Sequence, residues 1–186
     1  MAWNREHAGV AAAPSVAIGW SVTAMAEAVG RLAGASSWAL PRVASAVGET
    51  VWWVTLVDAT LVRYHPNAYD KALVSGTVHR PEAEGALAGL RYVRNQLGRS
   101  ADPAGFMQPA SADDGACWTW RPLPEPQLGA FTTRARQWEM SRYDAYQTRL
   151  AGREITRTFN LCAGFLTSAA ALAEVGGPPR QENRDS

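Results

Sequence analysis

A long segment without any turn signal, from Pro41 to Tyr64, constrains the fold of this chain more than any other feature. It contains Val51-Trp52-Trp53-Val54, a run rich in residues that favour strands. A strand of this length is rare, however, and a proline at the start suits the first turn of a helix. His65-Pro66 then ends the pattern. The segment therefore predicts one long helix.

Four other segments also have helical periodicity or helix-capping residues, so we expect five helices at most. Between them lie a connector at residues 66–78 and a proline-rich loop at 100–130. A loop this long is usually functional, clamped or mobile, and its Trp118-Thr119-Trp120 piece favours a clamped, partly extended loop. The expected helices cover residues 15–35, 41–64, 81–97, 133–151 and 154–174.

These elements predict a mainly α fold, a four- to five-helix bundle with a long loop. The chain has 186 residues, of which 47% are hydrophobic, which is enough for one domain over 1–186 and excludes a wholly disordered protein. We expect frayed tails at 1–14 and 176–186. With 18 basic and 17 acidic residues the formal net charge is +1, which argues against nucleic-acid binding by bulk charge alone.

Motifs for nucleotide hydrolysis, zinc proteolysis and α/β-hydrolase chemistry are absent from the sequence. Cys117 and Cys162 do not have C-x-x-C spacing, and His7, His65 and His79 do not complete a zinc set. We therefore expect two free thiols, with a disulfide between them as the alternative, and no metal or cofactor.

The uncharged run at residues 8–26 bears on the cellular compartment, because it ends in Ala24-Met25-Ala26 and is similar to a signal peptide. Pro14 and Gly19 dilute the run, it contains no leucine, and Glu6 lies where a basic region would be. We expect a cytoplasmic protein without a membrane span.

Two apolar stripes at helical spacing are each interrupted by one charge, and the two charges have opposite sign. Asp58 interrupts the stripe in 41–64, and Arg94 interrupts the stripe in 81–97. A buried unpaired charge costs several kcal/mol, so Asp58 and Arg94 should form an ion pair or line one polar pocket. The stripes are Val47, Val51, Val54, Asp58 and Leu61, and Leu87, Leu90, Arg94 and Leu97.

Such a pair could also have a purely structural role. It would then fix the register of the two helices without any chemistry, or Arg94 would extend to water from near its helix end. Arg91 and Arg99 lie close by in sequence, and three arginines together would make a local anion site. Clustered arginines at a helix end can equally be solvated surface.

The segment from Leu90 to Arg99, with Arg94-Asn95 at the end of a core helix, resembles the motif of the HEPN superfamily. That family has small helical bundles with an arginine, often followed by a polar residue, and a histidine a few residues later. The resemblance implies metal-independent RNA cleavage, frequent dimers, and toxin or antiviral roles. Where the histidine would stand, this chain has Arg99, Ser100 and Ala101. The resemblance therefore implies a member without catalytic activity.

A wider resemblance, to a set of actinobacterial proteins, rests on the segments 49–58, 94–95, 118–123 and 150–153 and implies no activity. We expect the chain to bind RNA or a protein partner, and to form a homodimer if it follows the HEPN pattern. Two alternatives remain open: a helical scaffold without a nucleic-acid role, and a ribonuclease in which His65 or His79 supplies the missing base. The expected binding residues are Arg91, Arg94, Asn95 and Arg99, with Asp58 orienting Arg94.

Overall fold

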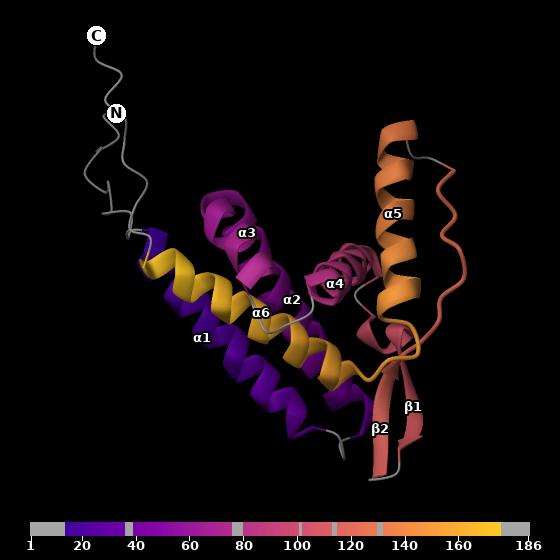
Figure 1. Ribbon diagram of the computed structural model, residues 1–186. Helices are drawn as coiled ribbons and strands as arrows, with labels where there is room; N and C mark the ends of the chain where they lie inside the picture. Colours follow the sequence, from indigo (N-terminus) through magenta and orange to yellow (C-terminus); the bar gives the residue numbers. More distant parts are fainter. Residues whose placement is uncertain are drawn as a thin grey trace, which may run out of the picture.

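The computed structural model describes residues 14–35, 39–75, 80–100, 102–112, 115–129 and 132–175. This part of the chain forms six α-helices and one β-hairpin, so the mainly α prediction is confirmed (Figure 1). The tails expected to fray lie outside the described residues, except that Pro14 begins the first helix. The helices are α1 (Pro14–Ala33), α2 (Leu40–Tyr64), α3 (Pro66–Ser75), α4 (Arg80–Ser100), α5 (Thr133–Arg149) and α6 (Ile155–Val175).

The helix that the sequence analysis missed is α3, which occupies most of the expected connector. Pro66 does end α2, but it also stands at the first position of α3, where its missing N–H costs nothing. The backbone N–H groups of Ala68 and Tyr69 donate to the carbonyl of His65, which starts the new helix one residue after α2 ends. One proline therefore serves as the end of one helix and the start of the next.

The loop expected at 100–130 contains more regular structure than predicted. A 3-10 turn (Pro103–Phe106) leads into β1 (Met107–Ala112), which pairs antiparallel with β2 (Gly115–Trp120). The register places Met107 opposite Trp120. The prediction of an irregular segment was wrong here, although the extended piece around Trp118 was correct.

The hairpin and the segment that follows it are held firmly on the helices. The indole of Trp120 is fully buried, and its Nε1 donates to Thr158 Oγ1 of α6 at 3.1 Å. Residues 121–129 then run alongside α5 (Figure 1), where the Tyr143 hydroxyl donates to the Leu123 carbonyl at 3.0 Å. In the described residues, the expectation of a clamped loop is therefore confirmed.

The core lies where α1, α2, α3 and α6 pack together, and α4 joins it from α2 (Figure 1). All residues of the α2 stripe are buried, including Asp58 at 1% exposure. Ile18 and Met25 of α1 are fully buried too, so this part of the apolar N-terminal run belongs to the core. Cys162 is buried, and both cysteines are free thiols.

Among the described helices, α6 (Ile155–Val175) alone is long and apolar enough to cross a membrane by length and composition. Inside the protein, 44% of its most apolar window is buried, and its packed face includes Phe159, Cys162 and Leu166. A core helix of a soluble protein meets the same length and composition test.

Helix α5 packs mainly on α4, and two glycines of α4 allow the close approach. A Cβ atom at Gly89 would lie 2.7 Å from Leu150 Cδ1 and 3.2 Å from the Cα of Tyr146. At Gly85 it would lie 2.7 Å from the Cγ of Arg149. The α4–α5 pair therefore depends on the absence of side chains at these positions.

Replacing Gly89 with alanine is expected to lower the free energy of unfolding by about 1–3 kcal/mol, because the methyl group overpacks the contact with α5. The matched control is Gly30→Ala in α1, where a Cβ atom meets nothing within 4 Å. This change should raise stability by about 0.5–1 kcal/mol, since glycine is a poor helix former. Urea unfolding measures both effects, and a stabilising Gly89→Ala would contradict the α4–α5 packing.

Candidate functional site

Asp58 pairs with Arg91 of α4. Arg91 Nε donates to Asp58 Oδ2 at 2.7 Å, and Arg91 Nη2 donates to Oδ1 at 2.8 Å. The hydroxyl of Tyr69 on α3 donates to Oδ1 at 3.0 Å. This buried carboxylate thus ties α2, α3 and α4 together through a two-pronged arginine contact, which is the strong form of such a pair.

The pairing corrects the expected ion pair between Asp58 and Arg94. From Leu90, the buried stripe of α4 continues to Val93, which is fully buried, and Arg94 lies at its half-buried edge. The step from Leu90 is three residues rather than four, which turns Arg94 out of the core. The alternative expectation holds, because Asp58 and Arg94 line one hollow.

The surroundings of Asp58 affect the pKa of neighbouring groups. Burial, followed by the charge of Asp58, raises the pKa of the Tyr69 hydroxyl. Burial acts to lower the pKa of Arg91, but the hydrogen bonds and charge of Asp58 outweigh it, so the net shift is upward. Tyr69 therefore stays protonated and Arg91 stays charged at physiological pH.

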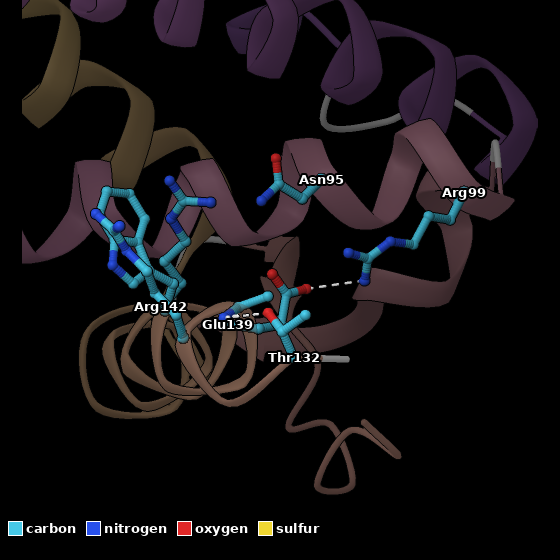
Figure 2. Close-up of a pocket in the computed structure, with 8 residues that line it drawn as sticks. Asn95, Arg99, Thr132, Glu139 and Arg142 are labelled. Carbon is cyan, nitrogen blue, oxygen red and sulfur yellow. Dashed lines mark hydrogen bonds and ion pairs between the residues drawn. The ribbon is translucent and has the colours of Figure 1, made fainter. Parts of the chain in front are cut away.

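A second buried carboxylate, Glu139 of α5, holds Arg99. Arg99 Nη1 donates to Glu139 Oε1 at 2.9 Å, and Gln96 Nε2 donates to the same oxygen at 2.8 Å. Glu139 is buried, and Figure 2 shows it facing Arg99 across the space between α4 and α5. Two members of the expected arginine cluster, Arg91 and Arg99, are therefore neutralised by carboxylates.

The third member, Arg94, lies on an exposed tryptophan. Its guanidinium carbon is 4.9 Å from the ring centre of Trp52, whose side chain is 52% exposed. The same arrangement recurs on α5, where Arg142 lies 5.3 Å from the ring centre of Trp138, which is 59% exposed. Neither Arg94 nor Arg142 forms an ion pair with a carboxylate in the described part of the chain. Sequence reasoning did not single out either tryptophan or Arg142.

These side chains line three neighbouring hollows along α4, between α4 and its neighbours α2 and α5. Three hollows of about 320, 670 and 500 Å³ share lining residues, and Asn95 borders all three. Arg94 borders the hollows of about 320 and 670 Å³. Arg142 borders the hollow of about 320 Å³ and also the one of about 500 Å³, which lies between α4 and α5. Figure 2 shows the Arg142 side chain extending from α5 toward α4. We call this surface the α2–α4–α5 groove.

The charge of the groove is positive although the whole chain is nearly neutral. Its described lining contains five arginines and two carboxylates, an excess of three positive charges. Both carboxylates are already engaged in ion pairs. An anion in the groove would therefore meet the guanidinium groups of Arg94 and Arg142, which lie beside flat aromatic surfaces. The five arginines are Arg91, Arg94, Arg99, Arg134 and Arg142.

No imidazole is among the residues that line the groove in the described part of the chain. His65 follows the end of α2, where its backbone N–H donates to the Leu61 carbonyl. His79 lies outside the described residues. The described residues also contain no group of three histidine, cysteine or acidic side chains that could hold a metal ion.

Comparison of the chain with protein-family models, with curated proteins and with solved structures finds no match.

Proposed function

We propose that this protein binds RNA in the α2–α4–α5 groove, with Arg94 and Arg142 on phosphates and Trp52 and Trp138 stacked on bases. The observation that carries the proposal is the repeated pairing of an arginine, free of carboxylates, with an exposed indole. Proteins that bind single strands combine a basic groove with aromatic platforms in this way. The positive excess lies in the groove, so a nearly neutral chain can still attract a polyanion locally.

As parts of this proposal, the protein is HEPN-like and cytoplasmic, and it binds RNA without cleaving it. Arg94 and Asn95, the pair that resembles the family motif, both line the groove. The residue where the histidine would stand first, Arg99, is held by Glu139. A guanidinium has five N–H donors and no acceptor, so Arg99 can donate hydrogen bonds to a phosphate but cannot take a proton.

The test is binding of a labelled, uridine-rich RNA by the double variant Arg94→Gln/Arg142→Gln. A hydrogen bond to a charged group contributes about 1.5–3 kcal/mol, so affinity should fall by about tenfold or more. Each lost phosphate contact should also make the plot of log K against log salt shallower by about 0.7. Fluorescence anisotropy over a salt series measures both quantities.

The matched control is Arg63→Gln, because Arg63 also lies on an exposed aromatic ring, that of Tyr64, but does not line the groove. Its affinity and salt dependence should equal those of the unmodified protein. Unchanged RNA affinity of the double variant would contradict the proposal, and so would absence of RNA binding by the unmodified protein. Capture of an acidic protein instead of RNA would favour the interaction-scaffold alternative. Cleavage of the RNA would favour the ribonuclease alternative.

A further inference from the structure

A separate hollow of about 500 Å³ lies between the start of α4, the end of α5 and the start of α6. None of the residues that line it also lines the α2–α4–α5 groove. A volume of this size is in the range of sites for small molecules. The hollow is therefore a second candidate for a ligand site.

Three arginines line this hollow: Arg149 in the last turn of α5, Arg153 in the connection, and Arg157 in the first turn of α6. None of the three forms an ion pair within the described part of the chain. These three guanidinium groups outnumber the two carboxylates that line the same hollow, which leaves an excess of one positive charge for a bound anion to neutralise. Guanidinium groups bind phosphate with two parallel hydrogen bonds, which makes phosphate the anion they suit best.

The position of Arg149 depends on a glycine. A Cβ atom at Gly85 would lie 2.7 Å from the Cγ of Arg149 and 2.9 Å from its Nε. The missing side chain on α4 thus allows Arg149 to lie flat against the helix where it borders the hollow. Backbone geometry adds to this, because α6 begins at Ile155 and the N–H groups of residues 155–157 precede the hydrogen bond from the Thr158 N–H to the Glu154 carbonyl, the first of the helical pattern.

Two carboxylates, Glu82 and Glu154, line the same hollow and are within 4 Å of no guanidinium among the described residues. Carboxylates accept hydrogen bonds from hydroxyl groups and repel further negative charge. A ligand that satisfies both sets of side chains carries one phosphate and several hydroxyl groups. A sugar phosphate or a nucleoside monophosphate has this chemistry.

We propose that this hollow binds a small phosphate monoester of a hydroxyl-rich compound, with the phosphate among Arg149, Arg153 and Arg157 and hydroxyl groups facing Glu82 and Glu154. The proposal is independent of RNA binding in the α2–α4–α5 groove. A polynucleotide would present phosphodiesters, which carry less charge per phosphate than a monoester.

The test is calorimetric titration of the full chain with ribose 5-phosphate, adenosine monophosphate and inorganic phosphate. We expect binding of the first two, with inorganic phosphate weaker. Arg153→Gln/Arg157→Gln should lower the affinity for ribose 5-phosphate by about tenfold or more. Gly85→Ala should weaken binding in the same direction by displacing Arg149, and Arg63→Gln should leave it unchanged.

Three outcomes would overturn the proposal. The first is no binding of either monoester at about 10 mM, a concentration that detects even weak affinities. The second is equal affinity for inorganic phosphate and ribose 5-phosphate, which would contradict the role of the carboxylates. The third is a loss of RNA affinity in Arg153→Gln/Arg157→Gln that equals the loss of ribose 5-phosphate affinity in the same variant. That result would make the hollow part of the RNA-binding surface. Arg94→Gln/Arg142→Gln should retain ribose 5-phosphate binding, so failure of one proposal is distinguishable from failure of the other.

Discussion

Replacing Arg91 with methionine is expected to lower the free energy of unfolding by about 3 kcal/mol. Among the described residues, the change leaves Asp58, which is 1% exposed, with the Tyr69 hydroxyl as its remaining hydrogen-bond donor. Removal of one partner of a buried pair typically costs about 3–5 kcal/mol. We expect the lower end of that range, because the Arg91 side chain is 37% exposed and water can reach the site it vacates.

The control for this prediction is Arg94→Met. Because Arg94 lies on Trp52 at the edge of the groove and forms no ion pair in the described residues, its loss should cost less than about 1 kcal/mol. Adding Asp58→Asn to Arg91→Met should restore part of the stability, since the unpaired charge is then removed. Urea unfolding of the four proteins measures these differences. An equal loss for Arg91→Met and Arg94→Met would show that Asp58 does not depend on Arg91.

Replacing both Trp52 and Trp138 with alanine is expected to produce a large loss of RNA affinity. Stacking of a base on an aromatic side chain contributes about 1–3 kcal/mol, so each substitution should weaken single-strand binding by about fivefold to 150-fold. Bases in a duplex are stacked on each other and are out of reach of these indoles. The substitutions should therefore act on single-stranded RNA and leave the weak, charge-driven binding of duplex RNA nearly unchanged.

Trp20→Ala is the matched control for the two tryptophans. Trp20 is 67% exposed, but it lies on α1 against Trp53 and not in the groove. Anisotropy with single-stranded and duplex forms of one RNA sequence separates stacking from charge. Trp52→Phe should restore part of the affinity, because phenylalanine keeps an aromatic face. A loss for Trp20→Ala as large as that for Trp52→Ala would place the RNA on another surface.

The stripe in α2 shows how far the sequence could predict this structure. Valines and a leucine at alternating steps of four and three left Asp58 as the one charge on a buried face, and it is buried as expected. Its partner could not be predicted as securely. A helix has 3.6 residues per turn, so after Leu90 either Val93 or Arg94 can continue the stripe. The packing of α4 against α2 decides which of the two residues is buried, and that contact joins distant parts of the chain.

The α5 side of the groove was harder to foresee because α5 is polar on most of its surface. The same reading of stripes could have found Glu139, since positions 139, 143, 146 and 150 lie on one face and the last two are fully buried. Nothing in the sequence indicates that Arg142 of α5 borders the same hollow as Arg94 of α4, or that Trp52 and Trp138 line hollows that share Asn95. That arrangement depends on how α4 lies between α2 and α5, which is a property of tertiary packing.

The most direct test of the central claim is ultraviolet cross-linking of the protein to a uridine-rich single-stranded RNA, with the attached peptides identified by mass spectrometry. Stacked bases form cross-links with the aromatic rings they touch, so the contacts are mapped without any substitution. The account predicts cross-links at Trp52 in α2 and Trp138 in α5, both suppressed by high salt. Cross-links confined to Trp20 or other residues outside the groove, or no cross-link at low salt, would contradict it.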